Sequence, residues 1–113
     1  MVARNNLLDA PPYPIENALK NLGSNLRTAR IRRSLTIATV AQKIGVGVRA
    51  VSDAEKGKPS TSAAVYTALL WTFGLLGEFA NLADPSLDAE GIALSLPRDG
   101  TRVRAGKGLD NDF

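Results

Sequence analysis

Apolar residues recur at helical spacing along most of the chain and predict a run of short helices. The first set predicts a helix over residues 15–33, although Gly23 weakens its middle and leaves open a division into two segments. Further sets predict helices over residues 36–44, 47–56, 60–73 and 75–82. The expected inner residues are Leu19, Leu22, Leu26, Ala29, Ile37, Val40, Ala41, Ile44, Val48, Val51, Ala54, Tyr66, Leu69, Leu70 and Phe73. The pattern predicts an all-α fold.

The centre of this pattern is a pair of helices over residues 35–57, joined by a turn that begins with glycine. Gly45 follows the first helix, at a position where helices commonly end in the left-handed conformation. Gly57 closes the second helix. Thr36 is expected to cap the first helix by accepting a hydrogen bond from an amide of its first turn. This arrangement fits a DNA-binding helix-turn-helix, and it fits a generic helical hairpin equally well.

The same stretch resembles the helix-turn-helix of the Xre and Cro/repressor family. The matching residues are Leu35, Thr36, Ala41, Gly45, Val46, Ser52, Glu55 and Gly57. The resemblance spans residues 20–80 and implies a five-helix, lambda-repressor-like DNA-binding domain. It also implies a structural ion pair between Arg30 and Glu55. The other arginines of that helix are then expected to be surface charge: Arg27, Arg32 and Arg33.

By this resemblance the second helix of the pair enters the DNA major groove. Arg49 would then bind guanine O6 and N7, Asp53 would accept from cytosine N4, and Val48 would pack on a thymine methyl group. Ser52 suits a base or a phosphate, and Gly47 also maps to a reading position. The lysines expected either to contact phosphates or to serve only solubility are Lys43, Lys56 and Lys58.

Three residues at this site depart from what DNA binding favours. Ile37 stands where the family usually has a glutamine that touches DNA. Gly47 stands where the family more often has serine or threonine, so a capping hydroxyl is absent. Asp53 repels phosphate unless it is well placed. A protein-interaction module that has lost DNA binding therefore remains an alternative function.

The distribution of charge supports a polyanion-binding face. Residues 1–57 carry a net charge of +5, residues 58–96 carry −3 and residues 97–113 carry +1, within a total of +3. The positive part contains the candidate helix-turn-helix, as DNA binding requires. A basic surface that is merely solvated is the alternative.

Several functional classes are disfavoured by composition. The chain has no cysteine and no histidine, and its acidic residues form no convincing catalytic pair, so we expect no enzyme activity and no metal site. Residues 45–50 fit a dinucleotide-binding pattern, but that pattern needs a preceding strand and an acid about 20 residues on. Because residues 58–77 contain no acid, we expect no cofactor. The absence of a long apolar run or a signal-peptide pattern favours the cytoplasm.

Prolines and surplus apolar residues define the expected domain limits. Three prolines mark residues 1–14 as a flexible arm, from which Arg4 is able to reach DNA, and the domain spans residues 15–83.

The apolar residues after Gly74 exceed what a core of this size buries, and proteins of this fold commonly pair through their fifth helix. We therefore expect a homodimer on a palindromic operator, with plain core packing as the alternative. The candidate interface residues are Trp71, Leu75, Leu76 and Phe79.

Residues 84–113 are expected to be a partly disordered extension, in which residues 92–96 alternate as a short strand would. Residues 83–85 (ADP), 91–94 (G-x-A-L) and 102–104 (RVR) resemble the extension of Xre-type regulators found beside HipA-like kinases. This resemblance implies a HipB-like antitoxin, a dimeric repressor of its own operon that also binds a toxin kinase. The partner-binding candidates are Arg102, Arg104 and Phe113. A stand-alone phage-type repressor is the alternative, and the presence or absence of a neighbouring kinase gene separates the two.

Overall fold

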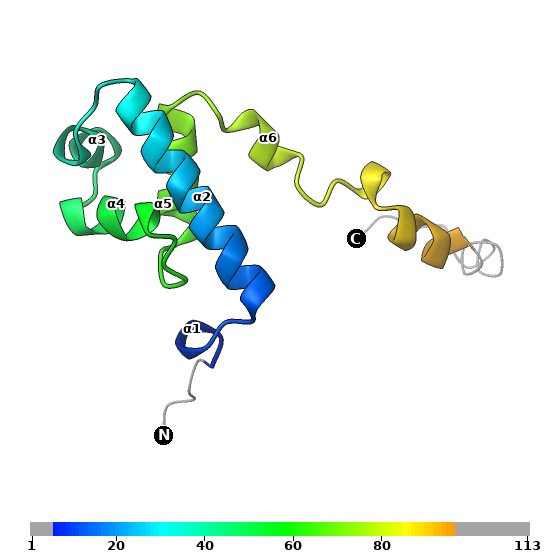
Figure 1. Ribbon diagram of the computed structural model, residues 1–113. Coiled ribbons are helices and arrows are strands. Elements are labelled where there is room, and N and C mark those ends of the chain that lie inside the picture. Colours follow the sequence, from blue (N-terminus) through cyan, green and yellow to red (C-terminus); the bar gives the residue numbers. More distant parts are fainter. Residues whose placement is uncertain (1–5, 97–113) are drawn as a thin grey trace. The chain divides into compact units, whose positions relative to one another are not determined.

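The computed structural model describes residues 6–96, which contain helices and no strand (Figure 1). This result confirms the all-α fold class. The chain divides into two compact units, Met1–Phe79 and Ala80–Phe113. The elements are α1 (Asn6–Asp9), α2 (Tyr13–Arg32), α3 (Ile37–Ile44), α4 (Val48–Glu55), α5 (Ala63–Thr72), α6 (Gly77–Ala80), the 3-10 turn η1 (Pro85–Leu87) and a helical segment over residues 89–96.

The core of the first unit is formed by four helices. Helix α4 packs against α2, α3 and α5, and α3 also packs against α5 (Figure 1). Val48 was expected to be an inner residue but is 53% exposed, because it lies about 120° around α4 from the buried Ala54. The buried side chains all occupy predicted inner positions: Leu26, Ala29, Val40, Ala41, Val51, Ala54, Tyr66, Leu69 and Phe73.

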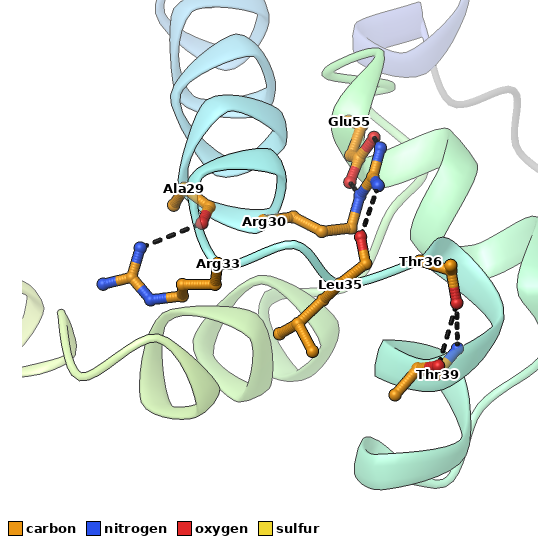
Figure 2. Close-up of polar contacts among 7 residues, drawn as sticks. All are labelled: Ala29, Arg30, Arg33, Leu35, Thr36, Thr39 and Glu55. Carbon is orange, nitrogen blue, oxygen red and sulfur yellow. Dashed lines mark hydrogen bonds and ion pairs between the residues drawn. The ribbon is translucent and has the colours of Figure 1, made fainter.

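Local hydrogen bonds fix where these helices begin and end. The Thr36 hydroxyl accepts from the Thr39 N–H at 3.0 Å, which confirms the predicted cap of α3 (Figure 2). Ser62 caps α5 in the same way by accepting from the Val65 N–H at 3.2 Å. Gly45 ends α3 with a φ of 77°, the left-handed conformation expected from the sequence.

Gly23 does not divide α2, so the predicted single helix is confirmed and the division that Gly23 left open does not occur. A Cβ at residue 23 would lie 2.6 Å from the Ala54 carbonyl oxygen and 2.7 Å from the Gly57 nitrogen. Gly57 has a φ of 71°, and a Cβ there would lie 2.6 Å from the Lys20 Cα. The two glycines therefore allow the backbone of α2 to approach the end of α4 more closely than any side chain would permit.

Part of the segment predicted to be a flexible arm forms a short helix. Residues 6–9 form α1, and α2 begins at Tyr13 instead of residue 15. Pro14 lies in the first turn of α2, where amides have no partner within the helix, so its missing N–H removes no hydrogen bond. Arg4 lies outside the described residues.

The second unit is helical where a strand was expected, so the predicted strand over residues 92–96 is wrong. The Asp88 carboxylate accepts from the Gly91 N–H at 2.9 Å, and the Asp88 carbonyl accepts from the Ile92 N–H at 2.9 Å. These two bonds start a helix over residues 89–96. Just before it, hydrogen bonds from the Ser86 N–H and hydroxyl lower the pKa of Asp84.

We predict that Gly23→Ala destabilises the domain, although alanine normally favours a helix over glycine. The added methyl would overlap the backbone at the end of α4, and relief of that overlap should cost about 1–3 kcal/mol of unfolding free energy. The free energy is measured by urea unfolding followed by circular dichroism. Gly77→Ala is the matched control, because a Cβ at residue 77 meets no atom within 4 Å. Equal effects of the two changes would contradict the close approach of α2 and α4.

Candidate nucleic-acid interface

Helix α4 is held in place by a guanidinium–carboxylate pair. The Arg30 Nε lies 2.5 Å from Glu55 Oε2, and Arg30 Nη2 donates to Glu55 Oε1 at 3.0 Å (Figure 2). Arg30 Nη1 also donates to the Leu35 carbonyl at 2.9 Å. These bonds to Glu55 raise the pKa of Arg30, and both side chains are nearly buried. The ion pair predicted from the family resemblance is confirmed, and it joins α2, the loop before α3 and the end of α4.

The outer face of α4 gathers most of the predicted reading residues. With a helical repeat of about 100° per residue, the face opposite Val51 and Ala54 contains the residues Arg49, Ser52, Asp53 and Lys56. Arg49 and Lys56 are exposed, whereas Ser52 and Asp53 are half-buried. The face therefore presents two cations to solvent beside polar groups that can accept hydrogen bonds.

The start of α4 has no side-chain cap. Gly47 is the N-cap residue with extended backbone, and no side chain there accepts from the first turn. Its carbonyl accepts from the Ala50 N–H at 3.1 Å, and a Cβ at residue 47 would meet no atom within 4 Å. The exposed Val48 follows directly. This end of α4 is open, with an apolar side chain and uncapped amides at its surface.

The predicted phosphate-contacting lysines differ in their surroundings. Lys43 in the last turn of α3 and Lys56 after α4 are exposed. Lys58 instead lies beside Asp53, with its Nζ 3.6 Å from Asp53 Oδ1. The structure therefore brings together one predicted phosphate contact and one predicted base contact, which the sequence analysis treated as independent.

The backbone around Lys58 is fixed by α4 and α5. The Lys58 N–H donates to the Asp53 carbonyl at 3.1 Å, and the Thr61 N–H donates to the Lys58 carbonyl at 3.1 Å. The buried Tyr66 of α5 donates its hydroxyl to the same Lys58 carbonyl at 3.2 Å. Burial raises the pKa of Tyr66, because the charged phenolate is poorly solvated there. The backbone of the loop that carries Lys56 and Lys58 is thus bonded to both α4 and α5.

A model of the helix-turn-helix domain family matches residues 21–82, which is more than half of the chain. The chain belongs to the helix-turn-helix domain family. The matched segment includes α3, the turn at Gly45 and α4, where the bracing pair and the outer face lie. The helix-turn-helix domain indicates a DNA-binding regulator, and such domains are typically non-enzymatic. Comparisons with curated proteins and with solved structures gave no significant match.

Two residues of the helix-turn-helix domain make contacts that bear on their expected roles. Ile37, at the position of the family's glutamine, is half-buried and packs against the core. Arg33 is exposed, as expected for surface charge, and it also donates to the carbonyls of Ala29 and Phe73, each at 2.9 Å (Figure 2 shows the bond to Ala29). Its guanidinium also lies 5.4 Å from the centre of the Phe73 ring. Arg33 therefore joins the end of α2 to the end of α5.

Of the predicted dimer residues, Trp71 lies on α5, Leu75 and Leu76 lie between α5 and α6, and Phe79 lies on α6. Three have exposed side chains, with exposed fractions of 67% for Trp71, 46% for Leu75 and 39% for Phe79, and Leu76 is half-buried. The partner-binding candidates Arg102, Arg104 and Phe113 lie outside the described residues.

Within residues 6–96, no cluster of three or more acidic, histidine or cysteine side chains could hold a metal ion. No helix in the same range has the length and apolar character needed to cross a membrane.

We predict that Glu55→Gln costs about 3–5 kcal/mol of unfolding free energy, because it leaves the nearly buried Arg30 charge without an anionic partner. Urea unfolding measures this cost. Glu16→Gln is the control, since Glu16 forms an exposed pair with Lys20 at 3.1 Å on α2. Loss of that exposed pair should cost only about 0.3–0.5 kcal/mol. Costs of similar size would show that the Arg30–Glu55 pair does not brace the domain.

We predict that Tyr66 makes stability fall at alkaline pH. Its pKa is raised in the folded state, so its contribution is complete below the unfolded value of about 10 and is lost as pH rises through the folded value. Unfolding free energies are measured from about pH 9 to pH 11 for the wild type and for Tyr66→Phe. The wild type should lose more stability over this interval than the variant. Parallel pH profiles would assign the alkaline loss to other groups.

Proposed function

We propose that this helix-turn-helix protein is a sequence-specific transcriptional repressor that binds DNA through α4. The observation that carries the proposal is the outer face of α4, where the exposed Arg49 and Lys56 flank the half-buried Ser52 and Asp53. The nearly buried pair of Arg30 and Glu55 holds this helix against α2. A rigidly held helix with such a face is suited to reading base edges in the major groove.

Direct base contacts are assigned to the residues at the open side of α4. Arg49 would bind guanine, Asp53 would accept from cytosine, and the exposed Val48 would meet a thymine methyl group. Ser52 would bind a base or a phosphate. The uncapped first turn after Gly47 lets the backbone approach DNA without an intervening side chain. Phosphate contacts are assigned to Lys43, Lys56 and Lys58, which fix the register of the domain on the duplex.

A homodimer of the repressor would set the distance between the two half-sites of its operator. Trp71, Leu75 and Phe79 are exposed apolar side chains that a second copy would cover, together with Leu76. A two-fold dimer places two copies of α4 in successive major grooves, about 34 Å apart, and so matches a palindromic operator. Promoter occlusion by this dimer is the proposed mechanism of repression. The protein would then act in the cytoplasm and associate with the nucleoid when bound to its operator.

The finer proposal is a HipB-like antitoxin that represses its own operon and binds a HipA-like kinase. It is supported by the resemblance of the residues after Leu82 to regulators found beside such kinases. It is also supported by the character of residues 80–96, which contain three acidic residues, no lysine or arginine, and several exposed leucines. A surface of this kind suits a partner protein with a basic and apolar face.

We predict that Arg49→Ala weakens binding to the DNA upstream of this protein's own gene by about 5- to 150-fold, the range expected for one bidentate guanine contact. Binding to scrambled duplex should change much less. Fluorescence anisotropy at two salt concentrations measures both affinities. The affinity of the wild type should fall steeply with salt, because each lysine–phosphate contact adds about 0.9 to the logarithmic slope.

Arg27→Ala is the matched control for Arg49→Ala, because Arg27 is an exposed arginine on α2 to which no DNA contact is assigned. It should leave the preference for upstream DNA unchanged. Equal and weak binding of the wild type to both duplexes would reject base readout. That result would favour a domain that uses the same fold to bind proteins.

A further inference from the structure

Asp53 and Lys58 face each other at the end of α4. The Lys58 Nζ lies 3.6 Å from Asp53 Oδ1, and the exposed fractions of the two side chains are 47% for Lys58 and 21% for Asp53. The ammonium group is therefore open to solvent, yet it already has an anionic neighbour. The carboxylate is the more enclosed member of the pair, so it depends more on this neighbour for its solvation.

The backbone of Lys58 cannot withdraw from Asp53. Gly57 precedes it in the left-handed conformation, and the space at that glycine is filled by the backbone of α2. The Lys58 N–H is bonded to the Asp53 carbonyl, and its own carbonyl accepts from Tyr66 and Thr61. Only the side chain of Lys58 is free to reorient. The Asp53 carboxylate and an anion on a ligand, such as a DNA phosphate, therefore compete for the ammonium group of Lys58.

We infer that the Asp53–Lys58 ion pair is a specificity gate, which lowers the affinity of the domain for DNA that lacks the correct base. This inference rests on the proposed DNA-binding function. On any duplex a phosphate competes with Asp53 for Lys58, and the loss of Lys58 leaves the carboxylate unpaired beside a polyanion. At an operator, a cytosine N4 amino group donates to Asp53 in place of Lys58. Lys58 is then released to a phosphate without stranding the carboxylate.

The neighbouring lysine provides an internal comparison. Lys56 is exposed and forms no ion pair with any residue in the range 6–96. It is available to a phosphate whatever the base sequence, and so contributes equally to specific and non-specific binding. Lys58 contributes fully only where Asp53 finds a base donor. The two lysines of this loop thus have different effects on the ratio of specific to non-specific affinity.

The test is a double-mutant cycle on a scrambled duplex of about two helical turns. The wild type, Asp53→Asn, Lys58→Gln and the double variant are compared by fluorescence anisotropy at low salt. With Lys58 present, Asp53→Asn should raise the affinity for scrambled duplex about two- to fivefold, as expected for release of a half-exposed ion pair. In the Lys58→Gln background the same change should have little effect. The preference for upstream DNA over scrambled duplex should fall in Asp53→Asn.

Two controls separate the gate from a general effect of charge. Glu90→Gln changes the net charge by the same amount in the unit Ala80–Phe113 and should not alter DNA affinity. Asp53→Asn should raise affinity equally with and without Lys56→Gln, because Lys56 is not its partner. Circular dichroism confirms that each variant is folded.

An equal gain from Asp53→Asn in both Lys58 backgrounds would mean that the carboxylate simply repels phosphates, and it would overturn the gate. No gain in either background would also overturn it. A wild type that fails to prefer upstream DNA would reject the proposed repressor function. The coupling between Asp53→Asn and Lys58→Gln on scrambled duplex would still test the proposed role of the ion pair. Absence of binding in all four proteins would overturn both proposals.

Discussion

The Arg30–Glu55 pair is the interaction on which the orientation of α4 depends. It connects α2 to the last residue of α4, and its third hydrogen bond holds the Leu35 carbonyl in the loop before α3. Both side chains are nearly removed from solvent, so each charge is tolerable only in the presence of the other. Such a pair adds little net stability compared with apolar packing, but it permits only one placement of the two helices. The face that α4 presents to a partner follows from that placement.

A second constraint sets the distance between the same helices. Gly23 and Gly57 let the backbones of α2 and α4 approach until no side chain fits between them. The glycines fix separation, while the planar fork of Arg30 fixes rotation, because its two bonds to Glu55 form only at one angle. Tyr66 then attaches the following loop to α5 through the Lys58 carbonyl. The position of α4 and of the loop lysines is therefore determined by groups that do not contact a ligand.

Features that depend on near neighbours were predictable from the sequence, and those that depend on distant partners were not. The caps at Thr36 and Gly45 involve residues within one helical turn, and periodicity identified the core. The role of Gly23 was not predictable, because helix propensity considers one helix alone, whereas the backbone that Gly23 approaches lies at the end of α4. The hydrogen bond from Arg33 to the Phe73 carbonyl was not predicted, because Phe73 is 40 residues away. A short apolar run fits strand or helix, and the Asp88 cap decided for helix over residues 89–96. The Arg30–Glu55 pair was expected only through the family resemblance.

The surroundings of the candidate DNA face bear on how such a domain would distinguish its site. Affinity from phosphate contacts alone favours every sequence equally, so a domain with many free cations gains binding and loses selectivity. Here the ammonium group of Lys58 already has an anionic neighbour in Asp53. Ile37 adds no polar contact, because its side chain packs against the core. Under the proposed function, selectivity would therefore come from the residues of α4 that are assigned to bases, chiefly Arg49 and Asp53. A second copy of the domain would increase this selectivity, because the base contacts at both half-sites must then form together.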